Sequence, residues 1–511
     1  MIDEEKILDK LKSWADPLNE ILEYDGIPMW VFYRQMFLTN NFPNRFFKYS
    51  VKSLGESFEK NKIKNKKTIS FITRKVILNN ELIKIKLRKS IKKIKDNSPK
   101  VLFQAQSTAI DNGKIYKIGN VVEKIKEQKK IKSYILAYEP IEKNNPKRIK
   151  QLENTIYEYI DKQLLKKIKK ESKELHKKWK NIPEERKKDL LKLNNKSLYP
   201  FIKDELNFLF SREFLFIVIA HHEAHKKIIK EENIKIICAQ GAGAIYPKTL
   251  FSAARIMNIP RLTIQHGMCF SYIETDLLKD TIFAVFGEKS KQELIEYEIP
   301  SKNIIITGPA IYDNIIEYSK IEPKNKTITL MTNGFYIYGL IEKNVYFNYI
   351  EKWIKELNKL NFDIIIKLHP EEKGFIKEYK NITKNYKRVT KITDSSTKEE
   401  LYNIIANSSI VINLGSSVAL ESMMLNKPVI TIMGLHHSAI KDFDIVVQRL
   451  LNSNASININ KDEDISSAIE YAFKNKKELI KKRKEFLEES CYKIDGNASD
   501  RVAKTIYKLI S

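Results

Sequence analysis

The sequence is poor in cysteine, glycine and proline, with 3 Cys, 15 Gly and 15 Pro in 511 residues. Cys238, Cys269 and Cys491 lie far apart without CxxC spacing, so neither a zinc site nor a disulfide framework is indicated, and a reducing cytoplasm fits best. Long apolar runs are also missing. The longest, 214–220, has about seven residues, whereas a helix needs roughly 20 to cross a bilayer. The charged N-terminus lacks the apolar stretch of a signal peptide. We therefore expect a soluble or peripheral protein.

Acidic residues are outnumbered by basic ones, 64 against 91, which gives a formal net charge of +27. This charge admits three partners: nucleic acid, an anionic membrane surface or an anionic substrate. A fourth interpretation is a coding bias, since the chain is crowded with Lys, Ile and Asn. The sequence contains no helix-turn-helix, RNP or zinc-finger signature, so nucleic acid is not the expected partner.

The first 98 residues are expected to form a helical, basic and aromatic N-terminal extension. Its aromatic residues are Trp30, Phe32, Tyr33, Phe37, Phe42, Phe46 and Phe47. They predict either a helical cap packed on the main body, which we favour, or a segment at the membrane interface. Ile83, Leu87, Ile91 and Ile94 recur at helical spacing among Lys and Arg. This pattern indicates a basic helix that lies on an anionic membrane or packs its apolar stripe on the protein.

From residue 99 onwards, strand and helix signals alternate in two series joined by a polar linker at 319–326. Strands are predicted at 100–106, 131–138, 234–239, 261–264, 281–286 and 303–307, and, after the linker, at 327–331, 362–368, 387–389, 410–414 and 429–432. A helical, Lys-rich stretch spans 145–230. Such alternation predicts parallel sheets covered by helices on both faces. We therefore expect an α/β protein with two Rossmann-like domains, 99–318 and 319–511, that face a cleft.

Ligands of open α/β sheets bind beyond the carboxyl ends of the strands, so the loops at those ends are the candidate site. In the second series, one strand ends at His369-Pro370, and another ends at Gly415-Ser416-Ser417 and leads into a helix. An imidazole, two hydroxyls and free backbone N–H groups suit a phosphate. We expect these two strands to be adjacent, so that their ends converge on one anion pocket. Ordinary alternatives are a histidine bonded to a carbonyl and a serine N-cap.

Further candidates lie nearby. Glu421 is placed one turn into that helix, where it can reach ribose hydroxyls or pair with a Lys, and Gly334 follows the first strand of the second series. In the first domain, the loops Gln240-Gly241-Ala242-Gly243 and Gln265-His266-Gly267 face the same cleft. Glu274 and Asp276 follow and are candidates for activating an acceptor hydroxyl.

Several stretches together resemble a known group, the GT-B-fold transferases of surface polymers. These are CDP-glycerol glycerophosphotransferases, bacterial polysialyltransferases and capsule Kdo transferases. The resemblance covers about residues 230 to 511. It is carried by IQHG at 264–267, GEKSKQELIEYEIPSKNIIITGPAIYD at 287–313, KLHP at 367–370, GSSVALESMMLNKPVI at 415–430 and DGNASDRVAKTI at 495–506.

The resemblance implies a nucleotide-activated donor, linked to CMP, CDP or UDP, whose phosphate is bound by Lys367, His369, Gly415, Ser416 and Ser417. It also implies that Glu421 holds the ribose and that the last helix crosses back to the first domain. No bound metal is implied. The acceptor, a glycan or a lipid-linked chain, would approach Gln240, Gly241, Gln265, His266 and Gly267, with His369, His266 and Glu274 as catalytic candidates.

We therefore expect a metal-independent glycosyltransferase that builds a capsule, lipopolysaccharide or teichoic-like polymer. It is expected to be cytoplasmic, either free or peripheral at the inner face of the membrane. A glycerophosphotransferase or a nucleotide-sugar epimerase of similar fold remains open. The cluster His221-His222-Glu223-Ala-His225 does not match the HExxH spacing of zinc proteases, so we interpret it as part of a helix.

Overall fold

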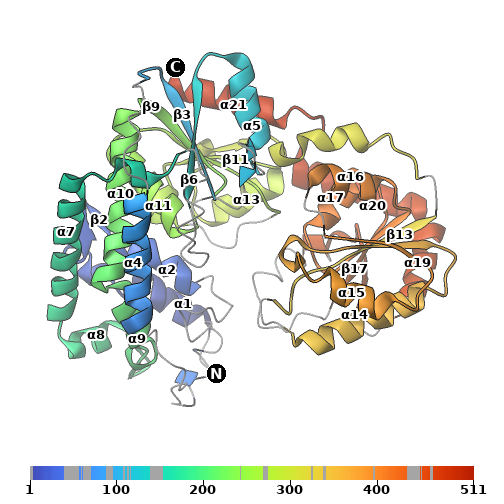
Figure 1. Ribbon diagram of the computed structural model, residues 1–511, viewed down its shortest axis with the longest axis horizontal. Coiled ribbons are helices and arrows are strands. Elements are labelled where there is room, and N and C mark those ends of the chain that lie inside the picture. Colours follow the sequence, from blue (N-terminus) through green and yellow to red (C-terminus); the bar gives the residue numbers. More distant parts are fainter. Residues whose placement is uncertain are drawn as a thin grey trace.

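The computed structural model describes residues 4–38, 54, 57–58, 60, 71–87, 96–106, 110–111, 114–115, 117–138, 154–241, 243–268, 274–323, 326–337, 341–394, 397–433, 449–450, 452–460 and 464–511. Figure 1 shows two lobes, each built around one sheet.

The first sheet has six strands, all paired in parallel. In spatial order they are β12 (Ile304–Ile306), β11 (Ile282–Val285), β10 (Arg261–Ile264), β9 (Ile234–Ala239), β3 (Lys100–Gln106) and β6 (Lys132–Tyr138). Chain order runs outward in both directions from β3, so the switch point of the sheet lies between β3 and β9.

The second sheet repeats the arrangement with six parallel strands. In spatial order they are β15 (Val389–Thr393), β14 (Asp363–Lys367), β13 (Thr327–Met331), β16 (Ile410–Asn413), β17 (Val429–Ile432) and β18 (Ile457–Ile459). The two sheets confirm the predicted fold class, two Rossmann-like units with a helical N-terminal region.

Helices cover both faces of the first sheet because alternate strand residues point to opposite sides. The helices of this lobe are α1 (Glu4–Ser13), α2 (Met29–Leu38), α4 (Phe71–Leu87), α5 (Gly119–Gln128), α7 (Lys162–Asn181), α8 (Glu184–Leu190), α9 (Tyr199–Leu209), α10 (Arg212–Glu231), α11 (Ile245–Ile256), α12 (Thr275–Leu278) and α13 (Glu288–Glu296). Leu102 and Ile237 face the core that contains α10 and α11, whereas Val101 and Ile236 face the core that contains α5.

The second sheet is covered in the same way. Its helices are α14 (Lys343–Leu357), α15 (Ile376–Thr383), α16 (Lys398–Ala406), α17 (Val418–Met424), α19 (Ile465–Lys474) and α20 (Lys476–Cys491). Ile328 and Ile412 point to the core with α14 and α19, and Val411 and Val429 point to the core with α16 and α17.

Two strand predictions need correction. The strand expected at 387–389 runs from Val389 to Thr393, and β18 was not predicted at all. Both are short edge strands, and only one face of an edge strand has strong apolar neighbours. The alternating polar residues of these segments therefore hide the signal that a buried strand gives.

The N-terminal segment packs as a cap on the first lobe. Trp30, Phe32 and Tyr33 are buried in the same hydrophobic core as the first sheet. Trp14 contacts both Trp30 and Trp179 edge to face, with ring centroids 5.0 and 6.3 Å apart. The cap interpretation holds for these residues. Phe42, Phe46, Phe47 and the Phe37 side chain lie outside the described part.

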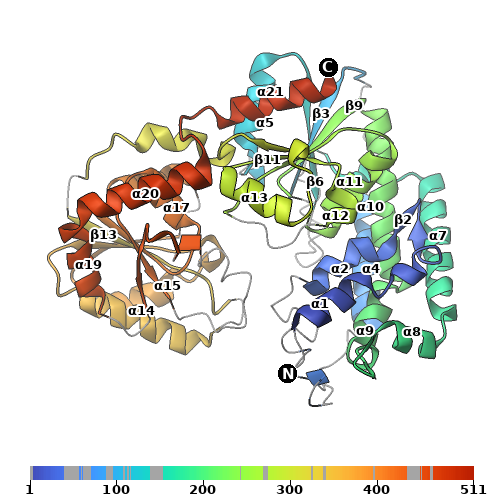
Figure 2. The ribbon, with the colours of Figure 1, turned by 180° about the vertical axis from the view of Figure 1, so that it is seen from behind.

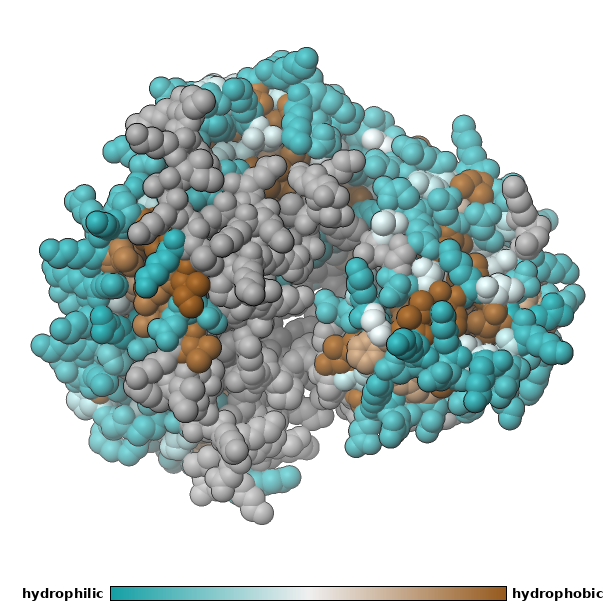
Figure 3. Space-filling model, viewed as in Figure 1, coloured by the Kyte–Doolittle hydropathy of each residue, from teal (hydrophilic) through white to brown (hydrophobic). Residues whose placement is uncertain are grey.

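Helix α4 carries Ile83, the first residue of the predicted apolar stripe. Ile83 is 42% exposed, whereas Glu81 and Lys84 are buried and paired at 2.6 Å. Tyr157 donates to Glu81 and completes the contact. Figure 3 shows a hydrophobic patch over α4, where Val76 and Ile83 are exposed. Residues 88–95, with Ile91 and Ile94, lie outside the described part. No described helix is long and apolar enough to cross a membrane.

The two lobes meet through the last helices, α20 and α21 (Ala498–Ile510). Figure 2 shows α20 running along the second lobe and α21 continuing over the first. Val502 and Ile506 of α21 enter the core of the first sheet. At Gly287, which precedes α13, a Cβ atom would lie 2.6 Å from the carbonyl oxygen of Glu489 near the end of α20.

We predict that Gly287→Ala weakens this junction. The φ of Gly287 is −160°, which any residue adopts, so the cost is steric and requires backbone to move. Overpacking of this kind costs about 1–3 kcal/mol. Gly119→Ala is the matched control, since no atom lies within 4 Å of its Cβ position and alanine favours a helix. Urea denaturation measures both variants. A Gly287→Ala protein as stable as wild type would contradict the prediction.

Candidate functional site

The donor-side loops begin level with one another at the carboxyl edge of the second sheet. Met331 of β13 pairs with Lys367 of β14 on one side and with Asn413 of β16 on the other. The expectation that β14 and β16 are adjacent was therefore wrong, because β13 lies between them. Two strand spacings separate their ends by about 10 Å. The loops that contain His369 and Ser416 thus flank the loop that follows β13.

His369 is fixed at the end of β14 by three hydrogen bonds. Its backbone N–H donates to Thr332 Oγ1 and Glu372 Oε2, both at 3.1 Å. Its Nδ1 accepts from the N–H of Glu371 at 3.3 Å. A neutral ring whose Nδ1 accepts must carry its proton on Nε2, and that proton is available to a ligand. Burial lowers the pKa of His369, so the ring is neutral at pH 7.

Glu372 organises this loop and was missed by the sequence analysis. It is fully buried, accepts from Thr332 Oγ1, and accepts from the Tyr379 hydroxyl at 2.5 Å. With His369 it forms a capping box, His-Pro-Glu-Glu, around the turn Pro370–Glu372. A capping residue followed three positions later by Glu is a readable signal. Gly334 lies next to this side chain, and a Cβ atom there would be 3.6 Å from Glu372 Cγ, an ordinary van der Waals contact.

The loop after β16 is shaped by Asn413 and Asn333. Asn413 Oδ1 accepts from the N–H of Ser416 at 3.0 Å, and Asn333 Nδ2 donates to the carbonyl of Leu414 at 3.4 Å. Gly415 has a φ of +69°, which glycine adopts without strain. Ser416 is half-buried, and the hydroxyl of Ser417 is exposed. The Ser416 and Ser417 side chains thus lie at the same sheet edge as His369, with the loop that follows β13 between them.

Two predicted donor ligands lie deeper than expected. Lys367 is 5% exposed, and its Nζ donates to the carbonyl of Leu368 at 2.8 Å. Glu421 is 6% exposed, and burial raises its pKa to about 7 although the nearby charge of Lys398 opposes the rise. Lys398 itself donates to the carbonyl of Ile311, in the segment that joins the lobes. Glu421 therefore fits the alternative interpretation, a glutamate that lies near a lysine, better than the interpretation that its carboxylate is open to ribose hydroxyls.

On the first sheet, His266 lies beside Gly241 at the ends of β10 and β9. A Cβ at Gly241 would be 3.5 Å from His266 Cε1, and the φ of +155° also favours glycine. Burial and the nearby charge of Lys117 lower the pKa of His266 to about 4, against the opposing effect of a hydrogen bond with the backbone of Gln240. The ring is therefore neutral at pH 7, and one of its two nitrogens is an acceptor.

Lys117 is a second residue that sequence reasoning missed. It lies before α5, next to the switch point between β3 and β9, and burial lowers its pKa. Among the described residues, none forms an ion pair or hydrogen bond with its ammonium group. No atom lies within 4 Å of the Cβ position at Gly119 or at Gly267, so space remains around this charge.

The buried side chain of Gln265 stabilises the His266 loop and does not face a ligand. It is 3% exposed, its Nε2 donates to the Gly267 carbonyl at 2.8 Å and to Ser290 Oγ at 2.9 Å, and its Oε1 accepts from Phe286 N at 2.7 Å. These bonds hold the turn that presents His266. Gln240 is half-buried beside it.

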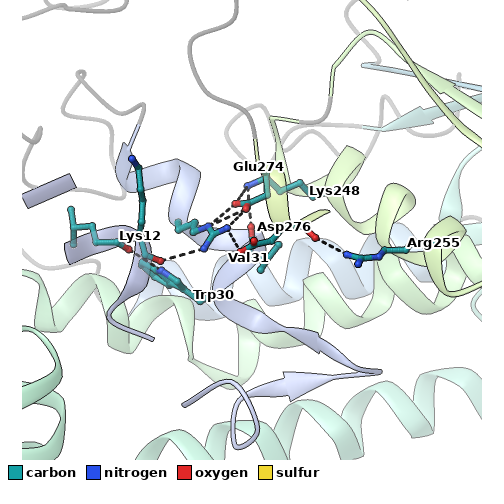
Figure 4. Close-up of polar contacts among 9 residues, drawn as sticks. Lys12, Trp30, Val31, Lys248, Arg255, Glu274 and Asp276 are labelled. Atoms are coloured by element: carbon teal, nitrogen blue, oxygen red, sulfur yellow. Dashed lines mark hydrogen bonds and ion pairs between the residues drawn. The ribbon is translucent and has the colours of Figure 1, made fainter. Parts of the chain in front are cut away.

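The catalytic role expected for Glu274 does not fit its surroundings. Figure 4 shows Glu274 facing Lys248 from α11. Arg34 from α2 also contacts its carboxylate. Arg34 Nε donates at 2.9 Å, and Lys248 Nζ lies 3.8 Å away. The Glu274 side chain is fully buried. A carboxylate held by two cations is a poor base, so Glu274 anchors the N-terminal cap instead. Asp276 also pairs with Arg34, at 2.5 Å.

The histidine cluster lies in α10, as expected. Asp25, His222 and Glu223 place ligand atoms within 4.8 Å of one another. Lys226 Nζ, however, lies 2.6 Å from Asp25, and Lys167 Nζ lies 2.7 Å from Glu223. These ammonium groups already neutralise the carboxylates. Asp25, His222 and Glu223 are therefore better described as part of an ion-pair network than as a metal site.

Part of the chain is similar to a known protein family. Residues 323–508 match the family model of CDP-Glycerol:Poly(glycerophosphate) glycerophosphotransferase. No curated protein sequence matches the chain.

Among solved structures, UDP-GlcNAc 2-epimerase from Neisseria meningitidis is 14% identical, with a TM-score of 0.49 and coverage of 80% of this chain and 99% of the other. MurG from Acinetobacter baumannii is 12% identical, with a TM-score of 0.44 and coverage of 80% and 99%. The wall teichoic acid polymerase TagF is 12% identical, with a TM-score of 0.44 and coverage of 86% and 97%.

The family match spans the loops of Gly334, His369 and Ser416–Ser417, and it lies within a chain that has two parallel six-stranded sheets. The second lobe of the chain is therefore similar to the glycerophosphotransferase family over residues 323–508.

Proposed function

We propose that this protein transfers a sugar from a nucleotide-activated donor to a growing cell-surface polymer. The observation that carries the proposal is the placement of His369, Ser416 and Ser417 in level loops at one sheet edge, inside the region that matches the transferase family. A span of about 10 Å between the outer loops suits a nucleotide diphosphate, which reaches across β13.

The donor-side groups stabilise the leaving nucleotide. When the bond between the sugar carbon and the phosphate oxygen breaks, negative charge develops on the diphosphate. The Nε2–H of His369 and the hydroxyls of Ser416 and Ser417 donate hydrogen bonds to that charge. Donors fixed in advance lower the barrier because they need not reorganise during the reaction. This stabilisation relies on hydrogen bonds and requires no bound ion.

On the acceptor side, we assign the base to His266 in place of Glu274. The ring nitrogen that does not bond to Gln240 accepts the proton of the acceptor hydroxyl as its oxygen attacks the sugar carbon. A pKa of about 4 makes the free ring a weak base. Negative charge from a bound donor raises that pKa and so strengthens the base when the substrates are in place.

Lys117 supplies a site for an anionic group of the acceptor. A half-buried ammonium that pairs with no described residue costs desolvation energy, and a bound phosphate would offset this cost. A phosphate in the acceptor, in its backbone or its lipid linkage, places the adjacent hydroxyl near His266. Gly267 and Gly119 leave room for it.

A second candidate function is favoured by the family match, whose printed description names a CDP-glycerol donor. In that reaction the acceptor oxygen attacks the phosphorus atom, glycerophosphate is transferred and CMP leaves. The products distinguish the two. Sugar transfer from a UDP or CDP donor releases a nucleoside diphosphate and adds a sugar mass to the acceptor, whereas glycerophosphate transfer releases CMP and adds a glycerophosphate mass.

We also propose that the protein works at the cytoplasmic face of the membrane. The net charge of +27 and the exposed Val76 and Ile83 of α4 support contact with an anionic lipid surface.

His369→Asn tests the donor-side chemistry. Asparagine preserves the capping acceptor that bonds the N–H of Glu371, but it lacks the Nε2 proton. We expect kcat to fall about 10²- to 10³-fold, the effect of losing one such donor, while the unfolding midpoint stays unchanged. Turnover is measured by nucleotide release and acceptor mass with the donor that wild type uses. His176→Asn, on α7, is the control. Near-wild-type turnover of His369→Asn would refute the role of His369.

Lys117→Gln tests the acceptor site. We expect the KM for the acceptor to rise about tenfold, the energy of one lost charge-assisted hydrogen bond, with the donor KM unchanged. The pKa of His266 should also move up towards its ordinary value, which NMR of labelled histidine measures. Lys126→Gln, on the exposed side of α5, is the matched control and should change neither quantity. An acceptor KM within twofold of wild type would contradict the assignment.

A further inference from the structure

Arg449 of the second lobe bonds directly to the loop that presents His266. It lies between β17 and β18, and its Nη1 donates to the carbonyl of Met268. Its Nη2 lies 2.6 Å from Glu293 Oε2 on α13 of the first lobe. One guanidinium thus joins the second sheet to two elements of the first. Its planar fork suits two acceptors at once.

Met268 is two residues beyond His266 and is anchored twice. Its side chain is buried in the hydrophobic cluster between the lobes, which also contains Leu450, Phe286 and Ile311. Its carbonyl is the acceptor for Arg449. On the other side of His266, Gln265 is held within the first lobe by Ser290 and Phe286. The loop is therefore fixed at one end by its own lobe and at the other end by the opposite lobe.

The pair formed by Arg449 and Glu293 is shielded from water. Their side chains are 16% and 11% exposed, whereas a second pair between the lobes, Lys289 and Glu489, has side chains 38% and 66% exposed and a distance of 3.4 Å. Both pairs start from α13. Exposed pairs contribute little because water and salt screen them, whereas a partly buried pair is screened less.

We propose that Arg449 is a positioning residue that sets the distance between His266 and the donor-side loops. This inference rests on the proposed transfer function. The donor binds to the second lobe and the base lies on the first, so the reacting atoms meet only when the lobes hold one relative position. A misplacement of about 1 Å between reacting groups costs up to about 100-fold in rate. Arg449 acts through the Met268 carbonyl and touches no reacting atom itself.

Arg449→Gln separates positioning from binding. We expect kcat to fall about 10- to 100-fold. The Kd for the nucleoside diphosphate, CDP or UDP, should stay within twofold, as measured by calorimetry. Lys289→Gln is the matched control and should leave both values unchanged. Arg449→Lys, which retains one donor, should recover part of the lost kcat. Wild-type kcat in Arg449→Gln, or a Kd that rises in step with the loss of kcat, would overturn the proposal.

A distance measurement tests the same contact without turnover. Spin labels at the exposed positions Lys302→Cys and Lys359→Cys, in a Cys269→Ser background, report the separation of the lobes. Arg449→Gln should broaden the distance distribution, and Lys289→Gln should not. An unchanged distribution in Arg449→Gln would refute the positioning role. If wild type transfers no group from any donor, the transfer function fails while this measurement still decides the role of Arg449.

Discussion

The buried carboxylate of Glu372 is the contact on which the donor-side loops depend. One of its oxygens accepts from the His369 backbone and from Thr332 at the end of β13, and the other accepts from Tyr379 on α15. Burial raises the pKa of Glu372, and the three donors oppose that rise. A charge in this position is stable only while every donor stays in place. The network therefore fixes the backbone of His369, while the N–H of Glu371 bonds Nδ1 and leaves the ring proton on Nε2.

The contact between the two lobes also depends on a few specific polar groups. Hydrophobic packing around Met268 and Leu450 holds the two lobes together but does not fix their relative orientation. Arg449 fixes that orientation, because its guanidinium binds two specific acceptors, the Met268 carbonyl and the Glu293 carboxylate. Gly287 allows the backbone of α20 to approach α13 where no side chain would fit. At the other edge of the first lobe, Arg34 and Lys248 bind Glu274 and tie the N-terminal cap to the segment that follows the His266 loop. That loop is thus held by parts of the chain that are far apart in sequence.

Much of this arrangement could be predicted because it depends on local patterns. Buried parallel strands are continuous apolar runs, and the loops of His369, Ser416 and His266 follow them directly. The order of strands could not be predicted, since nothing in the residues of β13 shows that it separates β14 from β16. The ion-pair partners of Glu274 and Glu421 could not be predicted from the sequence either. Arg34 lies 240 positions before Glu274, and pairing over such a sequence separation depends on the tertiary fold. Lys117 gave no signal in a chain crowded with lysine.

The central claim is that one diphosphate spans the His369 and Ser416–Ser417 loops across β13. A crystal structure with bound UDP or CDP measures this directly. The account predicts phosphate oxygens within hydrogen-bond distance of His369 Nε2 and of the Ser416 or Ser417 hydroxyl in the same complex. A nucleotide whose phosphates lie away from both loops, with the protein folded as described, would contradict it.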